Sequence, residues 1–154
     1  MAIRILIADD HAILRHGLIR TIKKTEDMIV AGEAEDGMAA IQKAQELSPD
    51  VILMDIEMPK VNGIEATRRI LHDRPETKVI ALSMHSAKAL ISEMLNAGAI
   101  GYLLKDCSFE ELIRAIRSVA AGNSYFSPSV VDTVVECYLQ RTESKPSLRV
   151  TSRS

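Results

Sequence analysis

The sequence lacks most of the features used by disulfide-rich, zinc-binding and membrane-spanning proteins. It has two cysteines, no tryptophan and 3% aromatic residues. Cys107 and Cys137 lie far apart, with no C-x-x-C spacing and no companion histidines, which excludes a cysteine-based zinc or redox motif. Apolar runs such as Val51 to Met54 are too short to cross a bilayer, and the N-terminus lacks the long apolar segment of a secretory signal. These absences predict a cytoplasmic protein with no membrane partner.

The charge balance also lacks a dominant sign. The chain carries 19 basic and 21 acidic residues among 154, for a formal net charge of −2. This balance gives no electrostatic footprint for nucleic acid or for a membrane surface, so the chain itself is not expected to bind DNA. The 47% of apolar residues suffices for one domain with a core, and function must come from a local site.

Short apolar runs alternate with longer amphipathic stretches along the chain. This alternation predicts an α/β fold, with a parallel sheet covered by helices on both faces. The predicted strands are Ile3 to Ala8, Met28 to Ala34, Val51 to Met54, Lys78 to Ser83 and Ile100 to Leu104. The predicted helices are Ala12 to Lys24, one capped by Asp36 and ending before Ser48, Ile64 to His72, Ala87 to Ala97, and one whose capping box begins at Ser108.

Two features of the predicted helices are specific enough to test. In the first helix, apolar residues at helical spacing, Ile13 and Leu14 among them, predict one buried face. After Gly122, Ser127-Pro128 reads as an N-cap and first-turn proline that open an additional helix through Leu139. We therefore expect residues 1–122 to form the α/β domain, 123–140 to add a C-terminal helix, and the polar stretch 141–154 to be a linker.

Polar residues follow four of the predicted strands. In an open α/β sheet the carboxyl ends of the strands form the ligand crevice, so these residues should meet there. Each alone has a structural explanation, as a helix cap or a loop residue. Their convergence on what one phosphate site requires favours the functional interpretation. The residues are Asp9, Asp10, Asp55, Ser83 and Lys105.

Three carboxylates in one crevice need a cation. Carboxylate oxygens suit Mg²⁺, with Asp10 and Asp55 as the chosen ligands and Asp9 acting directly or through water. Lys105 adds a positive charge and Ser83 a hydroxyl donor, which completes a phosphoryl pocket in which Asp55 can form an acyl phosphate. His11 follows the acidic pair and could touch the site, but it is assigned no catalysis, because a histidine in a first helical turn is more often a solvated surface residue.

At these residues the sequence resembles the receiver domain of two-component response regulators. The resemblance covers Ile3 to about Gly122 and rests on Asp9-Asp10, the segment Val51 to Pro59, the segment Ala81 to His85, and Gly101 to Asp106. The sequence Asp9-Asp10-His11 with Leu104-Lys105-Asp106 is similar to the NarL/FixJ or LuxR-type subgroup. The resemblance implies a flavodoxin-like, doubly wound, five-stranded parallel sheet in the order 2-1-3-4-5.

The resemblance also implies a role for each site residue. Asp55 would accept a phosphoryl group from a sensor histidine kinase, and the Mg²⁺, or Mn²⁺, would be held by Asp9, Asp10, Asp55 and the backbone carbonyl of Glu57. Ser83 and Lys105 would contact the phosphate. Ser83 would turn toward the phosphoryl oxygens and Tyr102 would rotate inward behind it, a coupled movement that forms the switch. Glu57 and His85 would tune dephosphorylation. The chain would not be an enzyme beyond its own slow phosphorylation and dephosphorylation.

The tail resembles the start of an effector domain. Val150-Thr151-Ser152-Arg153 is similar to the opening of the Leu-Thr-x-Arg-Glu motif that begins LuxR-type helix-turn-helix domains. We therefore expect a transcription regulator whose DNA-binding domain is missing from this chain, with DNA contacted only through that domain. A homodimer formed on phosphorylation is a further expectation.

Two other functions compete with this interpretation. The spacing Asp55-Ile56-Glu57 and the shared need for Mg²⁺ and lysine are compatible with a haloacid-dehalogenase-like phosphatase. In that class, however, the second acid is normally Asp and the nucleophile normally ends the first strand. The third possibility, an unphosphorylated receiver that serves only in dimerisation, is disfavoured by the complete set of site residues.

Overall fold

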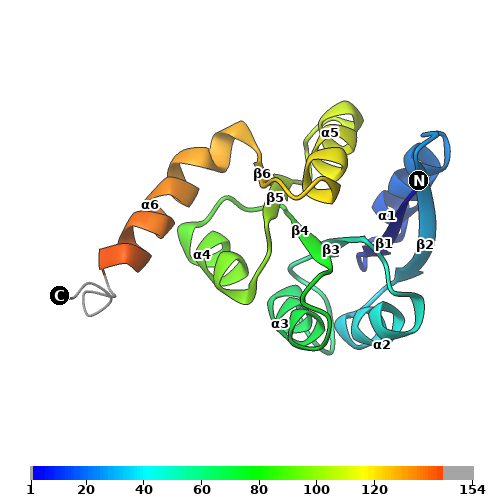
Figure 1. Cartoon of the computed structure of the whole chain (residues 1–154), viewed down its shortest axis with the longest axis horizontal. Coiled ribbons are helices and arrows are strands. Elements are labelled where there is room, and N and C mark those ends of the chain that lie inside the picture. The colour runs from blue at the N-terminus through cyan, green and yellow to red at the C-terminus, as the bar shows by residue number, and fades with distance from the viewer. Residues whose placement is uncertain (1, 144–154) are drawn as a thin grey trace.

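The structure, a computed structural model, describes residues 2–143, and strands and helices alternate along them (Figure 1). Each predicted strand begins and ends within one residue of an observed strand. The strands are β1 (Ile3–Ala8), β2 (Met28–Ala34), β3 (Val51–Asp55), β4 (Lys78–Ser83), β5 (Gly101–Leu104) and β6 (Tyr125–Phe126). The helices are α1 (Ala12–Lys23), α2 (Gly37–Leu47), α3 (Gly63–Asp73), α4 (Lys88–Ala97), α5 (Phe109–Ala120) and α6 (Val131–Glu143), which follows the 3-10 turn η1 (Pro128–Val130).

The strands form one parallel sheet in the order β2-β1-β3-β4-β5-β6. Its first five strands have the predicted order, and β6 is one strand more than predicted. Two residues are too few to show an alternating pattern, so β6 is defined by its pairing with β5 rather than by its own sequence. Gly101, opposite Tyr125, allows this approach, since a Cβ on Gly101 would lie 3.1 Å from the Tyr125 carbonyl oxygen.

Helices cover both faces of the sheet (Figure 1). The side chains of α1 and α5, such as Ile22 and Ile116, pack on one face of the sheet. The side chains of α2, α3 and α4, such as Ala44, Ile70 and Met94, pack on the other face. Central strands are therefore apolar throughout, and all five residues of β3 are buried. This rigid core fixes the positions of the residues that follow the strands.

Local signals place the helix ends largely as predicted. The Asp36 carboxylate accepts a hydrogen bond from the amide of Ala39, and the Ser108 hydroxyl accepts one from the amide of Glu111. The expectation of a buried Ile13 is wrong, because this side chain is 89% exposed at the start of α1, whereas Leu18 is buried. The apolar face of α1 therefore becomes fully buried only beyond its first turn.

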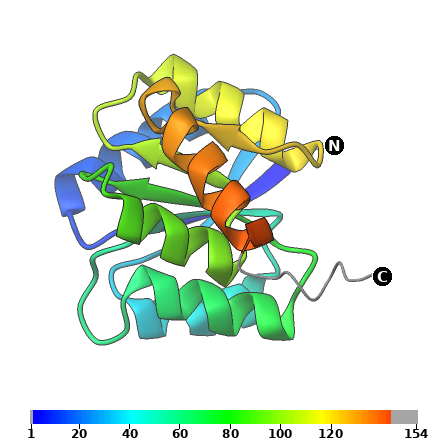
Figure 2. The same ribbon diagram turned by 90° about the vertical axis from the view of Figure 1, so that its left-hand side faces the viewer.

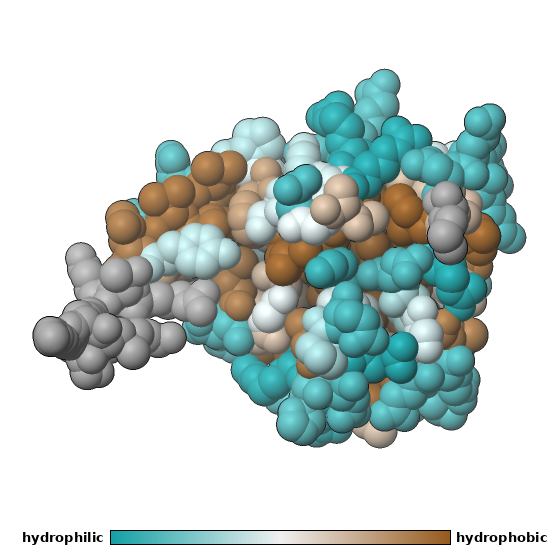
Figure 3. Space-filling view, viewed as in Figure 1, coloured by the Kyte–Doolittle hydropathy of each residue, from teal (hydrophilic) through white to brown (hydrophobic). Residues whose placement is uncertain are grey.

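The additional helix lies beside α4 at the β6 edge of the sheet (Figure 2). Val134 and Cys137 belong to the core that α4 also lines. The remaining apolar side chains of α6 gather on the surface at its solvent side, including Val131, Val135 and Leu139 (Figure 3). Most of the predicted linker, residues 144–154, lies outside the described residues. No helix within the described part of the chain is long and apolar enough to cross a membrane.

Candidate functional site

The carboxyl edge of the sheet brings together the side chains selected from the sequence. β1 ends at Ala8, whose register partner on β3 is Met54, so Asp9 and Asp55 follow on neighbouring strands. Ser83 ends β4, and its carbonyl accepts a hydrogen bond of 2.8 Å from the amide of Lys105, which follows β5. Strand register alone therefore gathers a cation, a hydroxyl and the carboxylates.

Asp9 is held rigidly below the surface of this edge. Its side chain is fully buried, and Oδ1 accepts a hydrogen bond of 2.7 Å from the amide of His11. The guanidinium of Arg15 donates a hydrogen bond of 2.6 Å to the Asp9 carbonyl and is itself held by Glu33, at 2.7 Å from Nε to Oε1. Arg15 lies in α1 and is 8% exposed, so this buried arginine fixes the backbone that presents Asp9.

Asp55 is the second buried carboxylate and is paired with the lysine. Its residue is 2% exposed, and the ammonium of Lys105 lies 3.1 Å from Oδ1. The same ammonium lies 3.2 Å from Oδ2 of Asp9. The Lys105 side chain is only 5% exposed, and one cation therefore faces two buried anions.

The balance of charges in this pair is unfavourable for ionised Asp55. Burial raises the pKa of the Asp55 carboxyl, the charge of Asp9 raises it further, and Lys105 opposes both effects, so that the pKa reaches about 7. Desolvation and the like charge outweigh the single ammonium. A bound cation would favour the ionised carboxylate, and this carboxyl group is therefore set up to respond to one.

The acidic edge can hold a metal ion. Atoms of Asp9, Asp10, His11 and Asp55 lie within 4.8 Å of one another. Among the described residues, no hydrogen bond reaches Oδ2 of Asp55, although this atom is buried, and Oδ2 of Asp9 has the shared Lys105 ammonium at 3.2 Å in place of a hydrogen bond. A buried carboxylate oxygen without a hydrogen-bond donor is costly unless a further cation is present, so the donor set fits a small divalent ion.

His11 lies inside this group, a contact that its position after the acidic pair allowed but to which no catalytic function was assigned from the sequence. Its Nδ1 atom lies 3.1 Å from Oδ1 of Asp9, 3.2 Å from Oδ1 of Asp10 and 3.9 Å from Oδ2 of Asp55. The ring is 61% exposed, as expected for a residue that precedes a helix. The prediction of a solvated surface histidine is therefore correct for the exposure of the ring, but the ring also contacts the carboxylates of Asp9 and Asp10. Only its adjacency to the acidic pair could have indicated this contact.

The loop after β3 folds back over Asp55. The amide of Glu57 donates a 3.3 Å hydrogen bond to Oδ1 of Asp55, and the amide of Gly63 donates one of 2.7 Å to the Ile56 carbonyl. A Cβ on Gly63 would lie 2.0 Å from the Asp55 carbonyl oxygen, so glycine is required where α3 begins. This close approach fixes the backbone on which Asp55 stands.

Glu57 and His85 form the rim of the site. Glu57 belongs to the loop after β3 and His85 to the loop after β4. Oε1 of Glu57 lies 3.5 Å from Nε2 of His85, and the two side chains are 64% and 54% exposed. They therefore face solvent across the opening between the two loops rather than the buried carboxylates.

Ser83, His85 and Tyr102 form a hydrogen-bonded group on β4 and β5. The hydroxyl of Ser83 accepts a 3.0 Å hydrogen bond from the amide of His85, and the hydroxyl of Tyr102 donates one of 2.8 Å to the His85 carbonyl. Tyr102 is fully buried, so its ring already points inward. Burial raises the pKa of the Tyr102 hydroxyl above its usual value, and hydrogen bonding with Ser83 opposes the rise. The hydroxyl is therefore a neutral donor at ordinary pH.

Ser127 connects this group to the additional helix. Its amide donates a 3.0 Å hydrogen bond to the Tyr102 carbonyl, and its hydroxyl accepts one of 3.2 Å from the amide of Leu104. Ser127 stands at the N-cap position of η1 with Pro128 in the first turn, as expected, but its hydroxyl caps no helical amide because it is used by β5, and α6 begins only after η1. The strand that carries Tyr102 is thus bonded on its outer side to the segment leading into α6.

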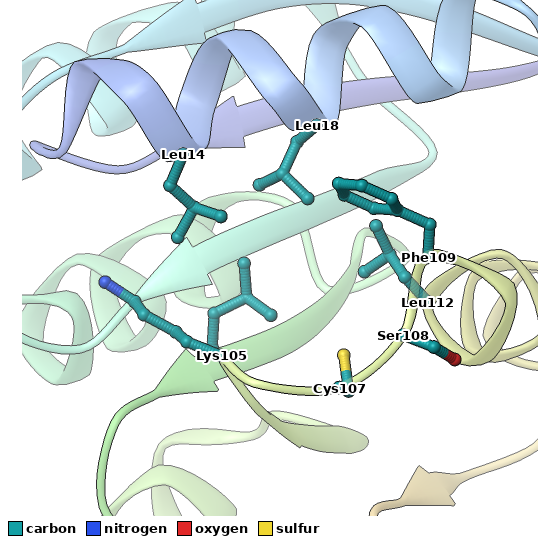
Figure 4. Close-up of a pocket in the computed structure, with 8 residues that line it drawn as sticks. Leu14, Leu18, Lys105, Cys107, Ser108, Phe109 and Leu112 are labelled. Carbon is teal, nitrogen blue, oxygen red and sulfur yellow. The ribbon is translucent and has the colours of Figure 1, made fainter.

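The stem of Lys105 runs beside a small apolar cavity between α1 and α5 (Figure 4). Leu14 and Leu18 line it from α1, and Phe109 and Leu112 from α5. Cys107 also lines it, and burial raises the pKa of that thiol to about 11, so the thiol stays protonated. The methylene groups of Lys105 therefore lie beside apolar side chains, and its ammonium extends to the carboxylates.

Comparison with known proteins identifies this arrangement. The family model described as "Response regulator receiver domain" matches residues 5–117. The chain belongs to the response regulator receiver domain family. The matched segment of this receiver contains the complete acidic edge, the lysine and the Ser83 and Tyr102 pair.

Individual relatives of the receiver are regulators of the LuxR type and related proteins. The transcriptional regulatory protein DegU of Brevibacillus brevis is 41% identical over 136 residues, which cover 88% of this chain and 58% of DegU. A LuxR-family response regulator from Aurantimonas has a structure with a TM-score of 0.83 at 33% identity, covering 90% of this chain and 99% of that one. The isolated receiver of RcsB from Salmonella enterica serovar Typhimurium, solved with the phosphomimetic BeF3−, has a TM-score of 0.79 at 28% identity, with coverage of 86% and 99%.

Proposed function

We propose that this receiver is a phosphorylation-dependent switch in which Asp55 accepts a phosphoryl group from the phosphohistidine of a sensor histidine kinase. The observation that carries the proposal is the position of Asp55. Its buried carboxylate contacts the Lys105 ammonium through one oxygen and has another oxygen with no hydrogen bond from the described residues. A nucleophile beside a fixed cation is what phosphoryl transfer requires.

The transfer needs positioning and charge neutralisation more than covalent catalysis. An oxygen of Asp55 attacks the phosphorus, the bond between phosphorus and the donor nitrogen breaks, and its electron pair stays on the donor imidazole. The Lys105 ammonium and the Ser83 hydroxyl bind phosphoryl oxygens of the resulting acyl phosphate. Bound Mg²⁺, or Mn²⁺, would supply positive charge to the transferred group, held by Asp9, Asp10, Asp55 and the carbonyl of Glu57.

The group around Tyr102 supports a switch. The Ser83 hydroxyl accepts a hydrogen bond from the amide of His85, and Tyr102 holds the carbonyl of the same His85. To donate its O–H to a phosphoryl oxygen, the Ser83 side chain would turn toward the phosphate and disturb the hydrogen bond from His85. A change at Ser83 would therefore alter the loop after β4 and the hold of Tyr102 on it. Such a local change in charge biases a hydrogen-bonded element that has two arrangements.

The rim residues support a role in the lifetime of the acyl phosphate. Glu57 and His85 would border the path of the water that hydrolyses the acyl phosphate, and Oε1 of Glu57 and Nε2 of His85 lie 3.5 Å apart on exposed side chains. The same observation weighs against a haloacid-dehalogenase-like phosphatase. That mechanism needs the acid two positions after the nucleophile to face the reacting phosphate, whereas Glu57 is 64% exposed and pairs with His85.

The match covers 58% of the length of DegU. We propose that a DNA-binding domain outside this chain carries the response and that this chain contacts DNA only through it. Phosphorylation would favour a homodimer, and the protein would act in the cytoplasm as a transcription regulator. DegU, a relative of this chain, is named as a transcriptional regulatory protein.

The proposal is tested by incubating the protein with Mg²⁺ and acetyl phosphate and measuring its intact mass. Wild type should gain the mass of one phosphoryl group, and Asp55→Asn should gain none. Asp132→Asn, which changes an exposed carboxylate on α6, is the matched control and should be modified like wild type. Failure of wild type to gain mass, or an equal gain by Asp55→Asn, would overturn the assignment of the acceptor.

A further inference from the structure

His11 lies among the carboxylates of the receiver, and the metal site proposed above gives it no function. Its Nδ1 atom lies 3.1 Å from Oδ1 of Asp9 and 3.2 Å from Oδ1 of Asp10. Oδ2 of Asp55 is farther away, at 3.9 Å. A nitrogen that could bind a metal therefore approaches three carboxylates that converge on it from two strand ends.

Two of these distances match the separation between neighbouring ligands of one octahedral ion. Two ligands at neighbouring corners are about 3.0 Å apart when each bond is about 2.1 Å, and opposite corners are about 4.2 Å apart. The separations from Nδ1 to Oδ1 of Asp9 and to Oδ1 of Asp10 have the neighbouring value. The separation to Oδ2 of Asp55 lies between the two values, so binding of Asp55 by the same ion requires a small shift of its side chain.

The contacts around Nδ1 conflict with one another unless a cation is present. The Lys105 ammonium lies 3.2 Å from Nδ1 of His11. This nitrogen is the same atom that contacts the carboxylates of Asp9 and Asp10. A neutral imidazole nitrogen carries either a proton, which suits the carboxylates, or a lone pair, which suits the ammonium. It cannot satisfy both neighbours. A metal ion accepts the lone pair of Nδ1 and the carboxylate oxygens together, which removes the conflict.

The buried oxygens provide independent support for a ligand at this place. Oδ2 of Asp55 is buried and accepts no hydrogen bond within residues 2–143. Oδ2 of Asp9 is also buried and faces the Lys105 ammonium at 3.2 Å, the same cation that contacts Oδ1 of Asp55. One ammonium for two buried carboxylates leaves negative charge that a further cation would neutralise, so the cluster does not depend on His11 alone to indicate a metal.

We propose that Nδ1 of His11 is a further ligand of the divalent ion, and that it shifts the preference of the site from Mg²⁺ toward borderline ions such as Co²⁺ and Ni²⁺. The inference rests on the proposed function in one respect, namely that the acidic edge binds a divalent ion. Imidazole nitrogen suits these transition ions, whereas Mg²⁺ takes oxygen ligands and retains water. The ring is 61% exposed, so it can turn into solvent and leave an all-oxygen set for Mg²⁺.

The test is calorimetric titration of the chelator-treated protein with Mg²⁺ and, separately, with Co²⁺. In His11→Phe the affinity for Co²⁺ should fall at least tenfold, and the affinity for Mg²⁺ should change less than twofold. His16→Gln, which removes an exposed histidine from α1, the helix that follows His11, is the control and should change neither affinity. The visible absorption of bound Co²⁺ should also differ between wild type and His11→Phe.

An unchanged ratio of Co²⁺ to Mg²⁺ affinity in His11→Phe would overturn the inference. A second measurement uses the wild type alone, so it does not depend on how the variant folds. Zn²⁺ should shift the Nδ1 ¹⁵N resonance of His11 and leave that of His16 in place; equal shifts or none would also overturn it. Wild type that gains a phosphoryl group with Mg²⁺ but fails these tests retains the proposed function, so the two failures are distinguishable.

Discussion

The ammonium of Lys105 lies 3.1 Å from Oδ1 of Asp55, and both side chains are almost completely buried. A lone ion pair in such surroundings would lower the pKa of the acid, whereas the pKa of Asp55 is raised to about 7. The difference arises from desolvation and from Asp9, whose Oδ2 shares the same ammonium at 3.2 Å. The receiver therefore holds Asp55, the proposed acceptor, in a site that is short of positive charge.

Removing the lysine charge should raise the pKa of Asp55 further. Lys105→Met keeps an apolar side chain beside the cavity between α1 and α5 and removes the ammonium. In the wild type this ammonium lowers the pKa of Asp55 and so opposes the effects of burial and of Asp9. A ¹³C NMR titration of the Asp55 carboxyl, without metal, should give a pKa above that of the wild type. Lys24→Met, at an exposed lysine after α1, should leave the titration unchanged. An equal or lower pKa in Lys105→Met would contradict this account of the charge balance.

The raised pKa of Asp55 also predicts how stability depends on pH. The unfolded carboxyl, at its usual 3.8, releases its proton well before the folded one, at about 7. Between these values the folded state binds more protons, so this group makes stability fall as pH rises. Urea unfolding with a chelator should therefore show wild type losing stability relative to Asp55→Asn from about pH 4 to about pH 7, with a constant difference above. A difference that does not vary with pH would contradict the shift.

Two glycine substitutions should have opposite effects. Gly63→Ala places a Cβ 2.0 Å from the Asp55 carbonyl oxygen, and the required backbone shift should cost about 3 kcal/mol. Gly17 lies within α1, and Gly17→Ala adds a methyl group at an ordinary contact distance of 3.8 Å from the Phe109 ring of α5. This change should stabilise the protein by about 1 kcal/mol through helix propensity. Urea unfolding measures both changes. Similar effects at the two positions would show that the close approach at Gly63 does not constrain the acceptor.

The connection from Tyr102 to α6 should depend on the Ser127 hydroxyl. Ser127→Ala leaves the amide of Leu104 without its partner, which should cost about 1 to 3 kcal/mol. Hydrogen exchange at the Leu104 amide should accelerate as well. Ser129→Ala, at an exposed position two residues on, should change stability by less than about 0.5 kcal/mol and leave that amide protected. Unchanged exchange in Ser127→Ala would show that the hydroxyl does not hold β5.

Much of this fold could be predicted because each buried parallel strand corresponds to a short apolar run in the sequence. The ends of β1 and β4 follow directly from such runs, and strand register then brings Asp9, Ser83 and their partners to one edge. β6 could not be predicted, since two residues show no alternating pattern and the strand is defined only by its pairing with Gly101 and Tyr102 of β5.

Single side chains were harder to predict than strands. Ser127 has the sequence of an N-cap, but its hydroxyl is taken by the amide of Leu104, a competition that only the tertiary structure decides. His11 has the exposure expected of a surface histidine, and its contacts arise from the direction of one rotamer. Local patterns specify which residues reach the carboxyl edge of the sheet. They do not specify which way an exposed ring turns there.

The central claim is that a phosphoryl group on Asp55 changes the structure around Ser83 and Tyr102. The most direct test records amide NMR spectra of the protein with Mg²⁺ before and after addition of BeF3−, which mimics the phosphoryl group on the acceptor. The account predicts large shifts in wild type at Ser83, His85 and Tyr102, with smaller shifts reaching Ser127 through β5, and none of them in Asp55→Asn. Unchanged spectra in wild type, or the same shifts in Asp55→Asn, would contradict it.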